Sequence, residues 1–244
     1  MRSYKCANTK HSNLMPKQVI MLFGQPGAGK GTQAELLADV TGYYHFESSK
    51  AIESCFKTEN PERVFEIEGQ KYKVADEIKK WETGELVSAP FVVFLMEEKI
   101  RGLAKEDKSI IFSGSPRTIY EAEKEIPFLK ELYGVENIKF ILLEISAETT
   151  IFRNSHRRIC ELVRHSILFS PETEKLTKCP LDGSNIIRRK LLDDPETIKN
   201  RLRVFKEESF PVIEIIEKHG INLNKINGEQ TISDVHKDIL EAIK

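Results

Sequence analysis

The sequence has almost no net charge and no long hydrophobic run, and each absence excludes a class of protein. Lysine and arginine number 37 against 38 aspartates and glutamates, a formal net charge of -1. No overall field therefore attracts nucleic acid or an anionic membrane, and any anion-binding site must be local. No stretch approaches the roughly 18 apolar residues that a membrane-spanning helix needs.

Cysteine is also scarce. Four cysteines among 244 residues do not make a disulfide framework, which indicates a reducing compartment and predicts a cytoplasmic protein. Residues 1–16 are polar and basic, without the apolar core of a signal peptide. We expect this leader to be disordered, or translation to begin at Met15.

Apolar runs alternate with helical patterns along the rest of the chain. Buried strands are expected at 19–23, 110–112, 140–143 and 221–226. Helices are expected at 31–40, 89–105, 119–133, 147–158, 195–218 and 232–244. This alternation predicts an α/β fold, a three-layer sandwich around a central parallel sheet. Residues 46–87 and 159–190 interrupt the rhythm and are interpreted as insertions over the ligand-binding edge of the sheet.

A glycine-rich loop between the first strand and the first helix carries the strongest motif. Its sequence is GQPGAGKGT, from Gly24 to Thr32. Glycines allow backbone N–H groups to converge on phosphate oxygens, and Lys30 adds a positive charge at the helix N-terminus. Thr32 is expected to orient Mg²⁺. A tight turn with a solvated lysine is the alternative, which the flanking strand and helix disfavour.

Gly31 separates Lys30 from Thr32, and in this spacing the loop resembles the P-loop of the adenylate kinases, a family of nucleoside-monophosphate kinases. Other motifs that resemble those of this family follow in the same order, so that the resemblance extends over the chain from about Lys17. The resemblance implies a core of residues 17–45, 88–158 and 191–244, an insertion at 46–87 that binds the nucleoside monophosphate (NMP), and a lid at 159–190. It also implies that ATP contacts the residues Gly27, Ala28, Gly29, Lys30, Gly31, Thr32, Arg153, Arg157 and Gln230.

The resemblance further assigns an arginine clamp. Arg117, in a segment similar to the family's D-G-F-P-R-T, grips the acceptor phosphate, and Arg157 and Arg201 contact the transferring phosphoryl group. Together with Lys30 these are the expected catalytic residues, since phosphoryl transfer requires neutralised charge and excluded water. Substrate-binding residues are expected at Ser48, Lys50, Glu85, Leu86, Val87, Gly114, Arg117, Glu121, Arg189 and Arg201. Taken singly, each arginine is as well explained as a solvated surface charge.

Three positions depart from the family pattern. Glu53 stands where the family places an acceptor-phosphate arginine, and Lys50 is expected to compensate. Glu121 replaces a glutamine that reads adenine, and an ionised carboxylate can only accept hydrogen bonds, which keeps AMP and CMP as candidates and disfavours UMP. Ser113 replaces the aspartate that organises the hydration shell of Mg²⁺.

The lid resembles the zinc-stapled lid of some adenylate kinases. Cys160, Cys179 and Asp182 match three ligand positions, but Val163 stands at the fourth. A structural zinc takes four ligands, and His165 is the candidate for the fourth, although its spacing does not match the motif. The degenerate motif favours a metal-free lid packed by Ile167, Leu168 and Phe169, with Zn²⁺ as the alternative.

The leading interpretation is an enzyme that moves the γ-phosphoryl group of Mg·ATP to AMP or a related nucleoside monophosphate, acting as a monomer without nucleic acid or membrane partners. Two alternatives stay open. One is a nucleotide-binding relative with little or no turnover, which the residues Glu53, Ser113 and Glu121 favour. The other is a kinase for another small phosphate acceptor such as CMP.

Overall fold

The structure is a computed structural model that describes residues 17–164, 166–188 and 194–244. The expected leader at 1–16, the candidate zinc ligand His165 and the candidate substrate cation Arg189 lie outside the described residues.

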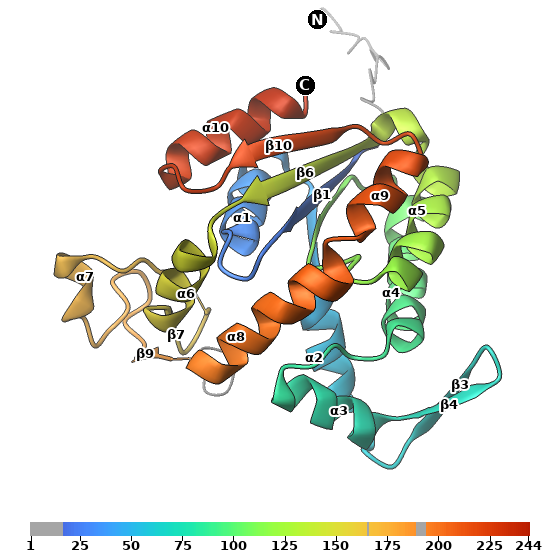
Figure 1. The fold of residues 1–244 in the computed structure, drawn as a ribbon, viewed down its shortest axis with the longest axis horizontal. Coiled ribbons are helices and arrows are strands. Elements are labelled where there is room, and N and C mark those ends of the chain that lie inside the picture. The colour runs from blue at the N-terminus through green and yellow to red at the C-terminus, as the bar shows by residue number, and fades with distance from the viewer. Residues whose placement is uncertain (1–16, 165, 189–193) are drawn as a thin grey trace, which may run out of the picture.

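A five-stranded parallel sheet forms the centre of the molecule, in the order β10-β6-β1-β5-β2 (Figure 1). Every residue of β1 is buried, which explains why that strand is a continuous apolar run. The strands are β1 (Val19–Gly24), β2 (Tyr44–Glu47), β5 (Ile110–Ser113), β6 (Ile138–Glu144) and β10 (Leu223–Asn227). The expected α/β sandwich is confirmed.

Helices cover both faces of the sheet and enclose two apolar cores (Figure 1). On one face, Ala34 and Leu37 of α1 pack with Val235 and Ile239 of α10. On the other face lie α4, α5 and α9. The bounds are α1 (Lys30–Thr41), α4 (Ala89–Lys105), α5 (Ile119–Tyr133), α9 (Val212–Lys218) and α10 (Ile232–Ala242), with a 3₁₀ turn at Val135–Asn137. None of the helices in the described ranges has the length and apolar character to cross a membrane.

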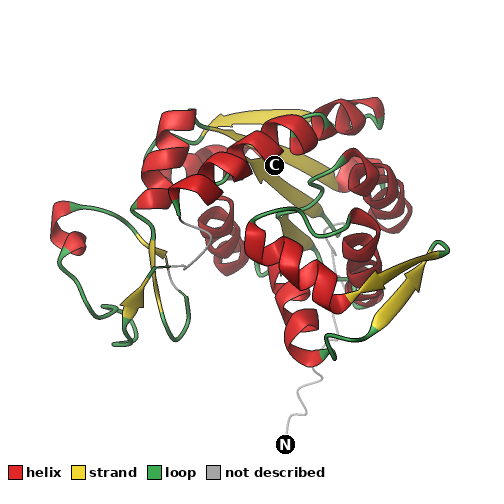
Figure 2. Cartoon of the chain, turned by 60° about the horizontal axis from the view of Figure 1, so that its bottom comes forward, coloured by secondary structure: helices red, strands yellow, loops and turns green. Residues whose placement is uncertain are grey.

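Two small units project from this core (Figure 2). The first contains α2 (Ser48–Thr58), the hairpin of β3 (Val64–Ile67) and β4 (Gln70–Lys73), and α3 (Val74–Thr83). The second contains β7 (Arg158–Cys160), β8 (Ser166–Ile167), α7 (Pro171–Glu174) and β9 (Ile186–Ile187). Phe46 and Glu47, expected in the first insertion, belong to β2 and pair with Phe112 and Ser113 of β5.

One expected helix ends earlier than the sequence pattern suggested, and another is interrupted. The helix expected at 147–158 is α6 (Ala147–Ser155), and Arg158 begins β7. The helix expected at 195–218 is divided into α8 (Pro195–Val204), a π-helical turn (Phe205–Ser209) and α9. Pro211 has no N–H to continue the helical hydrogen bonding, and it is the N-cap residue from which α9 starts.

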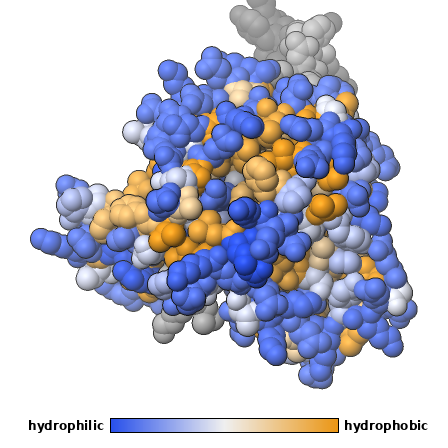
Figure 3. Space-filling model, viewed as in Figure 1, coloured by the Kyte–Doolittle hydropathy of each residue, from blue (hydrophilic) through white to orange (hydrophobic). Residues whose placement is uncertain are grey.

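The surface is mainly hydrophilic, with hydrophobic residues exposed on the side of α6 and the lid (Figure 3). Among them are Ile151, Phe152, Leu162, Leu168 and Leu181.

Candidate active site

The glycine-rich loop joins β1 to α1 and folds around the lysine. Lys30 Nζ donates hydrogen bonds to the carbonyl oxygens of Gly24, at 2.6 Å, and Gln25, at 3.0 Å. Gly27 and Gly29 have φ angles of +87° and +92°, which glycine adopts without strain. No side chain of the described residues caps the first turn of α1 and no acidic residue lies in that turn, so its backbone N–H groups can bind an anion.

Four cations gather beside this loop. Arg117, Arg201 and Arg157 act electrostatically on Lys30, and together with burial they lower its pKa to about 7, burial being the largest cause. The three arginines come from the β5–α5 loop, from α8 and from the chain after α6. Gathering four positive charges raises the free energy of the empty site through their mutual repulsion. A polyanionic ligand would neutralise these charges, so the arrangement favours the binding of such a ligand.

Helix α6, which carries Arg153, a residue expected to contact ATP, is hydrogen-bonded to the phosphate loop. Thr150 Oγ1 donates to Gln25 Oε1 at 3.1 Å, and Arg153 Nη1 donates to the carbonyl oxygen of Gly27 at 3.3 Å. A Cβ on Gly27 would lie 2.6 Å from Asn154 Nδ2. The glycine therefore allows close packing as well as a left-handed backbone.

The β10–α10 loop borders the phosphate loop from the other side. A Cβ on Gly228 would lie 3.5 Å from the carbonyl oxygen of Ala28. Gln230, expected near the donor base, donates from Nε2 to the carbonyl oxygen of Asn227 at 3.1 Å and to Asp238 Oδ2 at 2.8 Å.

A pocket of about 290 Å³, a volume that includes space open to solvent, lies between α2, α3 and the β5–α5 loop. It brings together most of the residues expected to bind the acceptor, and adds three that sequence reasoning missed: Ile52, Trp81 and Val92. The complete lining is Ser48, Ile52, Trp81, Glu85, Leu86, Val87, Val92, Gly114, Arg117 and Glu121. One wall is apolar and the other carries charge, as a nucleotide pocket requires.

The expected substrate cation Lys50 and the departing residue Glu53 both lie in ion pairs on α2 and its N-terminal flank. Lys50 does not line the pocket; its ammonium lies 3.0 Å from Glu47 Oε2. Glu53, at the place of the family arginine, lies 3.9 Å from Lys57 Nζ. Arg117 is the cation of the pocket lining, and its Nε donates to the carbonyl oxygen of Gly114.

The carboxyl ends of β2 and β5 meet beside the phosphate loop. Glu47 and Ser113 are partners in the strand register, so a carboxylate stands next to the position where the family aspartate is missing. Ser113 Oγ is 2.9 Å from His45 Nε2. Burial alone would raise the pKa of Glu47, but hydrogen bonds from Lys50 and Ser49 outweigh it and lower the pKa.

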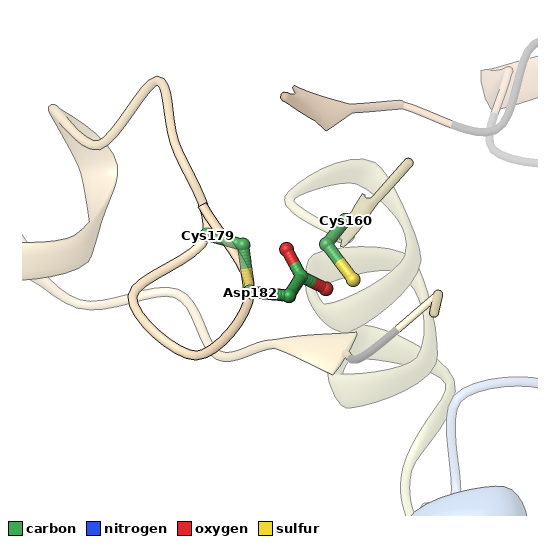
Figure 4. Close-up of side chains that lie close together, drawn as sticks. All are labelled: Cys160, Cys179 and Asp182. Atoms are coloured by element: carbon green, nitrogen blue, oxygen red, sulfur yellow. The ribbon is translucent and has the colours of Figure 1, made fainter. Parts of the chain in front are cut away.

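In the lid, Cys160, Cys179 and Asp182 turn toward one another (Figure 4). One ligand atom from each, two sulfurs and a carboxylate oxygen, lies within 4.8 Å of the others. Asp182 Oδ1 accepts hydrogen bonds from Ser184 N at 2.9 Å and Ser184 Oγ at 2.7 Å. Hydrogen bonds from Ser184 and from both thiols hold the pKa of Asp182 well below its usual range.

The apolar packing expected in the lid involves only part of the predicted set. Phe169 packs against Phe152 and His156, with ring centroids 5.8 Å and 4.4 Å apart. Leu168 is exposed and Ile167 is half-buried.

Sequence reasoning also missed two residues behind the pocket, Ser115 and Glu125. Both are buried; Ser115 is hydrogen-bonded to Glu121 and also to Glu125, so Glu125 is linked to Glu121 through the serine. The signal was present for Glu125, because residues four apart share one face of a helix and Glu121 was already a candidate.

A phosphate loop at the carboxyl edge of a parallel sheet, four converging cations and a second pocket define a P-loop phosphotransferase with two anionic ligands. The comparisons with known proteins agree. Residues 22–221 match the family model described as adenylate kinase. The chain is 31% identical over 231 residues to the adenylate kinase of Staphylococcus aureus (strain Mu50 / ATCC 700699), covering 92% of this chain and 98% of the relative. It is 30% identical over 229 residues to that of Bacillus subtilis (strain 168), with 92% and 97% covered. The chain belongs to the adenylate kinase family.

Proposed function

We propose that this chain transfers the γ-phosphoryl group of Mg·ATP to AMP, producing two diphosphates. The observation that carries this proposal is the convergence of Arg117, Arg157 and Arg201 on Lys30, next to a pocket for a second nucleotide. A module that only bound ATP would not need a cation shared between the phosphate loop and an acceptor pocket. Arg117 is such a cation, because it acts electrostatically on Lys30 and also lines the pocket. Family membership and the coverage of full-length adenylate kinases support the same reaction.

The chemistry requires positioning more than acid–base catalysis. The N–H groups at the start of α1 and the Lys30 ammonium hold the donor phosphates, while Arg117 holds the acceptor phosphate at the pocket mouth. Arg157 and Arg201 complete the ring of positive charge around the phosphoryl group between them. Transfer then proceeds in line, without a covalent intermediate on the enzyme. The two projecting units exclude water when they close over both ligands.

Mg²⁺ fits the edge where β2 and β5 end. Thr32 lies in the first turn of α1, and Glu47 provides an ionised carboxylate beside Ser113. Hydroxyl and carboxylate oxygens are ligands that Mg²⁺ and its bound waters accept. When bound with ATP, the ion neutralises charge on the phosphates. We assign to Thr32 and Glu47 the task of holding it in this chain.

The lid cluster fits Zn²⁺ better than the sequence alone indicated. Cys160, Cys179 and an ionised Asp182 supply three ligands of the kind found in structural zinc sites, already close together. The fourth position of a tetrahedral site would fall to water or to another part of the lid. We propose that zinc at this cluster stabilises the lid.

Coupled detection of diphosphate formation tests the proposed reaction. We expect turnover with Mg·ATP and AMP, and near-complete loss of turnover in Arg201→Ala with the fold intact. The matched control is Arg203→Ala on the same helix, because Arg203 is exposed and pairs with Glu207. ATP binding without diphosphate formation from AMP, CMP, GMP or UMP would instead identify a nucleotide-binding relative, the alternative that Glu53 and Ser113 favour.

A further inference from the structure

Behind the acceptor pocket, one serine hydroxyl joins two glutamates. Ser115 Oγ lies 2.9 Å from Glu121 Oε2 and 2.7 Å from Glu125 Oε1. All three side chains are buried, with exposed fractions of 3%, 2% and 2%. Glu121 lines the pocket, whereas Glu125, one helical turn further along α5, does not. The pocket therefore has one carboxyl group at its wall and a second one behind it.

Counting protons shows that these two carboxyl groups cannot both be ionised in this arrangement. A hydroxyl group has one proton and can donate only one strong hydrogen bond. Each of the two oxygen–oxygen contacts is short enough to need a proton between its atoms. The second proton must therefore belong to one of the glutamates, which donates it to Ser115 Oγ.

The surroundings decide which glutamate carries the proton. Glu121 Oε2 also accepts a hydrogen bond from the backbone N–H of Arg117 at 2.6 Å, which favours the ionised form. Glu125 Oε2 is buried without a hydrogen-bond partner among the described residues, a position that is costly for a charged carboxylate. Glu125 is thus the acid: it donates to Ser115, and Ser115 donates to Glu121.

The charged groups around the pair act in the same direction. Burial raises the pKa of Glu125 well above its usual value, and the negative charges of Glu121 and of Glu97 on α4 add to this effect. Burial also raises the pKa of Glu121, but the hydrogen bonds from Arg117 and Ser115 and the charge of the Arg117 guanidinium oppose that rise. Arg117 is the cation that faces Glu121, and within the described part of the chain no cation is found to act on Glu125 in the same way.

We infer that Glu125 is a protonated positioning residue which, through Ser115, holds Glu121 as an ionised group that only accepts hydrogen bonds from the acceptor base. This inference rests on the proposed function and deepens it. The base is held through a hydrogen bond that it donates, such as the one from the amino group of adenine, while its ring nitrogens without a proton receive no donor from residue 121. A glutamine at this position would offer both a donor and an acceptor.

Infrared difference spectroscopy tests the location of the proton without any turnover. At neutral pH we expect a carbonyl band of a protonated, buried carboxylic acid in the wild-type protein. The band should disappear in Glu125→Gln and persist in Glu121→Gln and in the control Glu123→Gln, since Glu123 is exposed on the same helix. Absence of the band in the wild type, or its loss only in Glu121→Gln, would overturn the inference.

Kinetics test the role of the pair in recognising the base. Purine riboside monophosphate lacks the amino group of AMP, and its KM in the wild type should exceed that of AMP about tenfold or more, since a charge-assisted hydrogen bond is lost. In Glu121→Gln the ratio of the KM of purine riboside monophosphate to the KM of AMP should be smaller than in the wild type. The reason is that the carboxamide can donate a hydrogen bond to a ring nitrogen of either compound. An unchanged ratio in Glu121→Gln would contradict the inference.

A pair of substitutions at Glu125 separates positioning from simple packing. Glu125→Gln retains a donor to Ser115 and should keep the wild-type KM for AMP, whereas Glu125→Leu should raise it and leave the KM for ATP unchanged. If the glutamine variant were as impaired as the leucine variant, Glu125 would have to act as an anion, against the inference. Failure of every variant and the wild type to form diphosphate would reject the proposed function, while the infrared result would still locate the proton.

Discussion

Binding of Mg·ATP should be accompanied by proton uptake at Lys30. In the empty site its pKa is lowered from 10.5 to about 7, first by burial and then by Arg117, Arg201 and Arg157. Phosphate groups placed among these cations reverse the electrostatic cause and return the pKa toward its ordinary value. At pH 8 only about one tenth of Lys30 is protonated before binding, so binding should take up about 0.9 proton per site.

Isothermal titration calorimetry in buffers with different ionisation enthalpies measures this uptake directly. The slope of the binding enthalpy against the buffer enthalpy gives the number of protons, and Lys30→Gln, measured at the same pH, removes any contribution of the nucleotide itself. At pH 6 Lys30 is already mostly protonated, so the difference between the two proteins should fall to about 0.1 proton. Equal slopes for the wild type and Lys30→Gln at pH 8 would refute the reasoning.

The same shift has a consequence for the empty protein. Because the folded-state pKa of Lys30 lies below its value in the unfolded chain, the unfolded chain binds more protons between about pH 7 and 10.5. The contribution of Lys30 to the free energy of unfolding should therefore increase with pH across this window and vanish in Lys30→Gln.

Three further results are expected. Gly27→Ala should lower the free energy of unfolding by more than the roughly 1–2 kcal/mol of a left-handed alanine, because its Cβ would meet Asn154 Nδ2 at 2.6 Å. In the same denaturant titration Gly29→Ala should show the backbone cost alone, since no atom of the described residues lies within 4 Å of the new Cβ. Purified protein should contain zinc by elemental analysis and lose thermal stability when the zinc is chelated, whereas Cys160→Ser should bind less zinc and lose less stability with the chelator. Equal zinc contents in the two proteins would exclude the Cys160, Cys179 and Asp182 cluster as the zinc site. Glu47→Gln should weaken Mg²⁺ binding to the ATP complex, measured by titration, and addition of Ser113→Asp should restore it; an unchanged affinity in Glu47→Gln would remove that residue from the metal site.

Much of this molecule follows from local patterns in its sequence. The helical spacing of apolar residues gives the observed bounds of α4 and α5, and the continuous apolar run gives those of β1 to within one residue. This is possible because burial on one or both faces of an element determines which positions are apolar. The glycine-rich loop is equally local, since its function depends on a few consecutive backbone groups and one lysine. The pocket residues Glu85, Leu86 and Val87 were found through resemblance, and the structure places them together.

Other features depend on which segments pack together. Arg157 and Arg201 are 44 positions apart in the sequence, and it is tertiary packing, including the contact between α6 and α8, that brings both close enough to act on Lys30. The strand register that sets Glu47 beside Ser113, and the fold of the lid that gathers Cys160, Cys179 and Asp182, are likewise long-range. The proton on Glu125 is the clearest case. A glutamate is ionised at neutral pH when exposed, and only burial beside Ser115 and Glu121, which the tertiary structure alone decides, makes the neutral form the more stable one.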